Sequence, residues 1–111
     1  MIEKILYDYL KTTKKLSIYM EQPAKKPSAF YLMEKTAGGQ SDKINQATIA
    51  IQSYADTLYD AALMNETIKA AMTDAIELDE VSRVEINSDY NFTDPTTKQY
   101  RYQAVFVVTY Y

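Results

Sequence analysis

Apolar residues near the start of the chain recur at spacings of three and four, which places them on one stripe of a helix. Acidic character near the start of this segment and lysines near its end also suit the helix dipole. The pattern predicts a helix over residues 2–13. The stripe consists of Ile2, Ile5, Leu6, Tyr9 and Leu10.

The next forty residues change to strand-like patterns that proline and glycine interrupt. "LSIYME" predicts a strand over 16–21 and "SAFYLMEKT" a strand over 28–36, with the basic turn "QPAKKP" between them because proline cannot donate a ladder hydrogen bond. Both glycines of the chain fall in "AGGQSD", which predicts a loop over 37–42. The alternation in "NQATIAIQS" then predicts a strand over 45–53, joined to the previous strand as a long hairpin.

A helical period returns over residues 54–78, a segment rich in strong helix formers. Ser53 is the predicted N-cap, with Asp56 three residues later in the capping-box position. The segment ends in "DAIELDE", which suits the helix dipole poorly and is not followed by glycine, so the pattern leaves the helix end open.

Two strands close the chain, predicted over 81–94 and 99–111 with a turn at "TDPTTK". In the last strand both sets of alternate residues become apolar after Ala104. We expect one set to be core, namely Tyr102, Ala104, Phe106 and Val108. For the other set, with Val105, Val107 and Tyr111, a subunit interface and a second core layer are both open.

The order of elements is one helix, three strands, a second helix and two strands. It predicts a single α+β domain over 1–111, with two helices packed on one face of a largely antiparallel sheet. The terminal strand is expected inside the sheet, and the face away from the helices is left to water or to another subunit.

The amino-acid composition excludes several classes of function. The 111 residues include no Cys and no His, which excludes a thiolate site and most familiar hydrolase arrangements. The net charge of −3 argues against a dedicated nucleic-acid module. The opening segment carries charges within its apolar pattern, so we expect neither a signal peptide nor a membrane span, and synthesis in the cytoplasm.

Three clusters are candidate chemical sites, and each also has a plain structural interpretation. The carboxylates Asp74, Glu77, Asp79 and Glu80 lack the calcium-loop pattern and are interpreted as a solvated helix end. The lysines Lys14, Lys15, Lys25 and Lys26, with Tyr19 between them, are interpreted as a soluble sheet edge rather than a nucleic-acid platform. "AGGQ" lacks the other residues of a phosphate-binding loop, and a flexible hairpin tip and a partner-docking loop ordered only in an assembly are both open for it. We therefore expect that the protein is not an enzyme and that it has no catalytic residue, no cofactor and no metal site.

Several longer runs carry a resemblance to a known family. They are "IEKILYDYL", "YLMEKT", "ATIAIQSYADTLYDAALMNETIKAAM" and "INSDYNFTDPTTKQYRYQAVFVVTYY". The chain resembles the tail-terminator or tail-completion proteins, small tail proteins of long-tailed phages and prophages of Gram-positive bacteria, over nearly its whole length. It departs from them in the first strand region, where a proline is expected but none occurs before Pro23.

The resemblance implies a structural virion protein, present in the host cytoplasm during assembly and then at the head-tail junction. It implies a homo-oligomeric ring of six copies that caps the head-proximal end of the tail tube, stops tube polymerisation and offers a head-attachment surface. The partners would be itself, a tail-tube protein and a head-completion or connector protein, with DNA only as passing cargo and no membrane. The implied docking loops are Gly38, Gly39, Gln40 and Ser41, and Phe92, Thr93, Asp94 and Pro95.

A second function class stays open beside this one, a small nucleic-acid-binding regulator from a mobile element. Tight and steeply salt-dependent DNA binding would favour it over the structural role. An enzyme would have to rely on carboxylates, lysines or tyrosines alone, and no motif supports that function.

Overall fold

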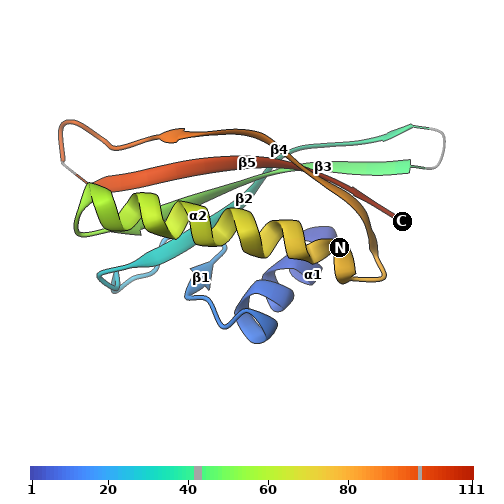
Figure 1. Ribbon diagram of the computed structural model, residues 1–111, viewed down its shortest axis with the longest axis horizontal. Helices are drawn as coiled ribbons and strands as arrows, with labels where there is room; N and C mark the ends of the chain where they lie inside the picture. The colour runs from blue at the N-terminus through green and yellow to red at the C-terminus, as the bar shows by residue number, and fades with distance from the viewer. Residues whose placement is uncertain (42–43, 98) are drawn as a thin grey trace.

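A computed structural model of the chain describes residues 1–41, 44–97 and 99–111 (Figure 1). The described part is of the predicted α+β class. Its elements are α1 (Ile2–Asp8), the π-helical turn η1 (Tyr9–Thr13), β1 (Ile18–Tyr19), β2 (Phe30–Ser41), β3 (Ile44–Ala55), α2 (Leu58–Asp74), the 3₁₀ turn η2 (Ala75–Glu77), β4 (Val81–Asn91) and β5 (Tyr100–Tyr110).

The strands form one sheet in the order β1-β2-β3-β5-β4. β1 runs parallel to β2, whereas the other three neighbouring pairs are antiparallel. β5 lies between β3 and β4, which confirms that the terminal strand is internal to the sheet. This position explains its apolar sequence, because an internal strand that packs against a helix layer must bury side chains along most of its length.

Both helices cover the same face of the sheet, as Figure 1 shows. α2 contacts β3, β5 and β4, while α1 contacts β2. Of the residues predicted as core in the last strand, Ala104, Phe106 and Val108 are fully buried, whereas Tyr102 is only half-buried. The centre of the core consists of Leu6, Leu10, Met33, Ile49, Ile51, Ile68, Met72, Ala104, Phe106 and Val108.

The predicted glycine loop over 37–42 is wrong. Gly38 and Gly39 lie in β2 opposite Ala47 and Gln46, and pairing continues to the last residue of β2. Neither glycine has a positive φ, so the ladder with β3 does not use the conformational freedom that predicted a loop. Asp42 lies outside the described residues.

The first predicted strand is much shorter than expected, two residues instead of 16–21. Lys15 turns the chain with a φ of 57° just after the first helix. β1 then pairs with only two residues of β2, because the chain leaves the sheet edge toward the segment that contains Pro23 and Pro27. The first helix has the predicted extent, although its last turn is π-helical, with a bond of 3.2 Å from the Lys14 N–H to the Tyr9 carbonyl.

The long helix begins later than predicted. Ser53 is a fully buried residue of β3 and not the N-cap, because β3 continues to Ala55 and pairs there with the start of β5. Thr57 caps α2 instead, and its side chain accepts a 3.1 Å bond from the Asp60 N–H. α2 ends at Asp74 and is followed by the 3₁₀ turn η2. The predicted helix over 54–78 therefore ends close to the observed position only if this 3₁₀ turn is counted as part of the helix.

β4 is an edge strand with two irregularities. Its register with β5 shifts between Val81 and Arg83 and again between Ile86 and Ser88. The strand ends at Asn91, three residues before the predicted boundary. The outer edge of the sheet is therefore interrupted twice, a device that hinders the addition of a further strand.

Candidate interaction surface

The sheet face opposite the helices is covered by neither helix, and we call it the open face (Figure 1). Val105 and Val107 lie near its centre, both half-buried, on the side of β5 opposite the buried Phe106. Their partners across β3 are Ala50 and Thr48. The structure thus brings together two of the three predicted interface residues on a small strip, which Ser88 and Glu85 of β4 border on the other side.

The third, Tyr111, is not on this strip. It lies beyond the end of β5 and is 82% exposed, and its N–H donates a 3.0 Å bond to the carbonyl of Glu80. It therefore belongs to the end of the molecule where β4 begins. The predicted interface residues occupy two separate regions.

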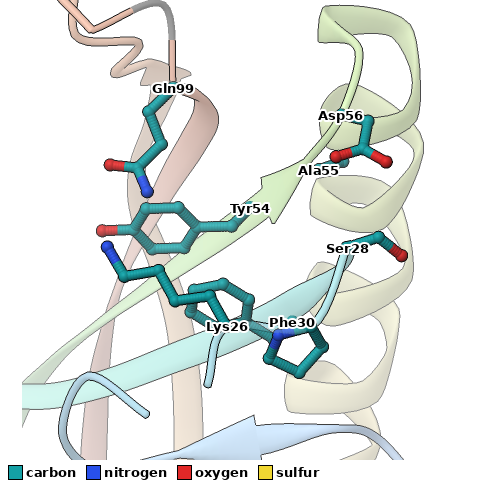
Figure 2. A pocket seen from close by; sticks show the side chains of 8 residues that line it. Lys26, Ser28, Phe30, Tyr54, Ala55, Asp56 and Gln99 are labelled. Carbon is teal, nitrogen blue, oxygen red and sulfur yellow. The ribbon is translucent and has the colours of Figure 1, made fainter. Parts of the chain in front are cut away.

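Residues 20–29 form a connecting segment, here called the strap, that reaches one end of the open face. Gln22 Nε2 donates a 3.1 Å bond to the Tyr54 hydroxyl. Below the strap, Phe30 stacks on Tyr54 with ring centroids 4.6 Å apart, and each ring is 2% exposed. Figure 2 shows Lys26 beside these rings, at a shallow hollow of about 260 Å³. The remaining lining residues are Pro27, Ser28, Ala55, Asp56 and Gln99.

A row of rings crosses the sheet at this end. The edge of Tyr19 meets Phe30 at 5.9 Å, and on the far side Tyr90 meets Phe92 edge to face at 5.7 Å. Arg101 joins the two groups, since its guanidinium carbon lies 5.6 Å from the Tyr54 ring centroid and 4.5 Å from that of Phe92. The row therefore spans all five strands through stacking and cation–π contacts.

Hydrogen bonds through two glutamine side chains connect Tyr54 to Tyr90 across the open face. The Tyr54 hydroxyl donates to Gln52 Oε1 at 2.7 Å, and Gln52 Nε2 donates to Gln103 Oε1 at 2.9 Å. Gln103 Nε2 in turn donates to the Tyr90 hydroxyl at 2.5 Å. This chain of bonds satisfies the polar atom of a buried tyrosine and holds an exposed one in place, so the surface is preorganised.

Arg101 is the central group of the surface. Its Nε donates to the Phe92 carbonyl at 2.7 Å and its Nη1 donates to the Tyr54 hydroxyl at 2.8 Å. A guanidinium has five N–H groups. Within the described part of the chain, the other three donate no hydrogen bond. The half-buried cation therefore keeps donor capacity for an acceptor from outside the molecule.

The predicted docking segment of Phe92, Thr93, Asp94 and Pro95 is an ordered turn beside this site. The Thr93 hydroxyl accepts a 3.2 Å bond from the Arg101 N–H, and the Thr96 N–H donates to the Asp94 carboxylate at 2.9 Å. That bond, with the nearby Thr97 and the Arg101 charge, lowers the pKa of Asp94 below its usual value. Phe92 is 37% exposed. The turn thus presents its ring from a fixed backbone.

The other predicted docking segment lies at the opposite end of the sheet, as Figure 1 shows. Gly38, Gly39, Gln40 and Ser41 are the last residues of β2, and the first three pair with Ala47, Gln46 and Asn45. A Cβ built on Gly39 meets nothing within 4 Å. The side chains of Gln40 and Ser41 lie outside the described part. The two segments are therefore far apart along the longest axis, which measures 44 Å.

Two of the four carboxylates in the predicted acidic cluster, Asp74 and Glu77, make contacts that hold the first helix in place. The Tyr9 hydroxyl donates to Glu77 at 2.7 Å and Lys14 Nζ lies 2.8 Å from Asp74, so two of its members tie the first helix to the end of α2. Burial, and then the Glu77 carboxylate, raise the pKa of Tyr9. Among the described residues, no group of three or more metal-ligating side chains is placed to hold an ion.

The remaining members, Asp79 and Glu80, are exposed, and neither forms an ion pair with another described residue. The predicted basic cluster is also divided. Lys14 serves the contact with α2, whereas Lys25 and Lys26 lie on the strap. The two halves thus belong to different parts of the molecule.

Sequence reasoning missed the residues that build this surface, namely Gln52, Tyr54, Tyr90, Arg101 and Gln103. A signal was present, because Arg101 and Gln103 alternate with apolar residues in the last strand and therefore share the side of Val105 and Val107. Tyr54 gave no such signal, since the helical pattern predicted from residue 54 placed it in a helix.

In comparisons with known proteins, no family model matches the chain and no curated protein matches it. Within the described ranges, none of the helices has both the length and the apolar character needed to cross a membrane.

Proposed function

We propose that this protein is a structural subunit of a phage tail, which forms a ring on the head-proximal end of the tail tube, stops tube polymerisation and offers a surface for head attachment. The ring would contain six copies, as the sequence resemblance implies. The role is not enzymatic, and it needs no cofactor. The proteins contacted are other copies of the chain, the tube protein and a head-completion or connector protein, while DNA only passes through.

One observation supports the proposal: a preorganised open face lies between the two segments predicted for docking, which are at opposite ends of the long axis. A capping subunit needs a lateral contact with its own kind and separate contacts along the assembly axis. Val105 and Val107 on the open face supply a candidate for the first. The segments ending at Ser41 and beginning at Phe92 supply candidates for the second.

The physical task is to complement the growing end of the tube without offering a new growing end. Many weak contacts, repeated by ring symmetry, can then give tight capping. Exposed Phe and Tyr rings held by Arg and Gln side chains are the type of residue that carries binding energy in protein interfaces. This composition supports a protein contact rather than a substrate pocket.

The test is a tube-growth assay with a purified tail-tube protein of a long-tailed phage. Tube polymerisation is followed by light scattering and electron microscopy, with and without the protein. We expect shorter tubes with a ring at one end. A variant of the turn, Asp94→Ala with Pro95→Ala, leaves Phe92 and Arg101 in place and should lose capping while circular dichroism stays unchanged. Tubes of unchanged length at saturating protein would reject the proposal.

The same preparation tests the nucleic-acid alternative. Labelled single- and double-stranded DNA is titrated at low salt and again at higher salt. We expect weak binding, because the net charge is −3. Tight binding with a steep salt dependence would favour the regulator over the tail subunit.

A further inference from the structure

We propose that copies of this protein join head to tail, with the exposed end that carries Asp79, Glu80 and Tyr111 of one copy docked on the Arg101 site of the next. The inference rests on the proposed function only in that both require self-assembly. The two surfaces are opposite in charge, and an ion pair between Arg101 and Asp79 or Glu80 would join them.

The receiving surface is a cation between aromatic rings. Arg101 keeps three N–H donors without a partner in the described part of the chain, while its other two hold Phe92 and Tyr54. Tyr90 and Phe92 are 42% and 37% exposed on the flank of this group. Because Arg101 is half-buried, an incoming carboxylate would be paired in a partly desolvated site, where charge-assisted bonds are strong.

The incoming surface has the opposite chemistry. Asp79 and Glu80 are exposed carboxylates in the turn after α2, without an ion pair among the described residues. Tyr111 is held beside them by the bond from its N–H to the Glu80 carbonyl, and its ring is the most exposed large apolar group of the described chain. Two acids and a ring therefore complement a cation flanked by two rings.

The two surfaces lie at opposite ends of one chain, and this selects a second copy as the partner. Tyr110, beside Tyr111, pairs with the first residue of β4, whereas Arg101 lies at the other end of β5. At about 3.3 Å per strand residue, roughly 30 Å separates them. A contact between different patches of identical subunits is heterologous, and such contacts close into a ring when the rotation between copies allows it.

This arrangement also joins the predicted interface residues that the fold separates. Arg101 shares the open face with Val105 and Val107, while Tyr111 belongs to the docking end of the neighbouring copy. The β4 edge is a poor alternative, because two register shifts interrupt it. Copies therefore meet through a face and an end.

The first test uses carbodiimide, which links a lysine to a carboxylate only when the two are in contact. Arg101→Lys keeps the charge and introduces an amine at the site. Equal amounts of ¹⁵N-labelled and unlabelled protein are mixed at high concentration, and cross-linked peptides are identified by mass spectrometry. We expect links from position 101 to Asp79 or Glu80 that join labelled to unlabelled chains.

Arg83→Lys is the matched control. Arg83 lies 2.8 Å from Glu85 of the same chain, so its variant should give a link within one copy and none between copies. The proposal is overturned if position 101 links to no carboxylate of another copy, or if its links between copies are as few as those of position 83. Protection of position 101 by a single-stranded oligonucleotide, without such links, would also overturn it in favour of a nucleic-acid partner.

The second test is a charge reversal. Glu80→Arg, at an exposed side chain, should weaken self-association at least tenfold in sedimentation without loss of fold. Glu66→Arg, on the exposed side of α2, is the control for net charge and should leave association unchanged. Combining Glu80→Arg with Arg101→Glu in one chain should restore part of the lost association, which a purely structural role of Arg101 would not do.

These outcomes are separable from those of tube capping. If tubes are capped but position 101 forms no link between copies, the ring uses other surfaces and only this inference fails. If the links form but tube length is unaffected, the head-to-tail contact stands and the proposed function fails.

Discussion

The two faces of β5 differ in how far the rest of the chain covers their side chains. On one face Phe106 is fully buried under the helices, and the chain provides all of its neighbours. One residue further, Val107 stands half-buried on the open face, with only strand neighbours around it. The first face is completed by folding. The second is not completed by the described chain, so under the proposed function it is the face available for association.

The largest effect should come from Phe106→Ala. Removing a buried ring from a packed core costs about 3–5 kcal/mol, through lost transfer energy and the cavity left behind. Urea unfolding followed by circular dichroism would measure the loss. A cost below about 1 kcal/mol would mean that the helix face is not the packed core.

Val107→Glu should separate association from folding. It places a charge at the centre of the open face, so self-association should weaken at least tenfold, about 1.4 kcal/mol, with little change in the unfolding midpoint. Sedimentation measures the first quantity and thermal unfolding the second. Val107→Thr, similar in shape and uncharged, serves as the control. Unchanged association of the Val107→Glu variant would mean that the open face is not the surface through which copies associate.

A smaller effect is expected at the covered end of the open face. Tyr54→Phe keeps the stacked ring but removes a hydroxyl that bonds with Gln22, Gln52 and Arg101. Leaving such groups unpaired should cost about 1–2 kcal/mol of folding stability. The strap should also become more accessible to limited proteolysis. If neither changes, the hydrogen-bond network does not support this surface.

The smallest effect is expected from Gly39→Ala. The backbone is extended and no atom lies within 4 Å of the new Cβ, so the substitution should be neutral or stabilise folding by up to about 1 kcal/mol. Chemical unfolding would measure this. A loss of tube capping without a loss of stability would then assign the glycine to a contact outside the monomer.

Sequence periodicity was sufficient for the class of fold and for the position of most elements. The alternation around Phe106 and Val107 correctly separated a core side from an open side, because a strand has only two sides to offer. The helix stripe at the start of the chain was equally reliable, since its spacing has no strand interpretation. Local pattern is informative where burial alone decides the structure.

Pairing between strands that are distant in the sequence could not be predicted from the local hydrophobic pattern. Gly38 and Gly39 resemble loop residues until β3 is aligned beside them. Tyr54 belonged to a helical pattern until pairing with Arg101 extended the strand past it. The contact of Arg101 with Phe92 likewise depends on the turn that brings them together. Tertiary pairing overrode propensity at each of these positions.

The two irregularities in β4 would matter if many copies of the protein assemble, as proposed, because such an assembly must avoid fibre formation. Each shift between Val81 and Arg83, and between Ile86 and Ser88, breaks the regular line of backbone donors and acceptors that a foreign strand would need as a template. Addition of a strand at this edge is thereby disfavoured, so under the proposed function side-chain contacts would set how many copies assemble and where assembly stops.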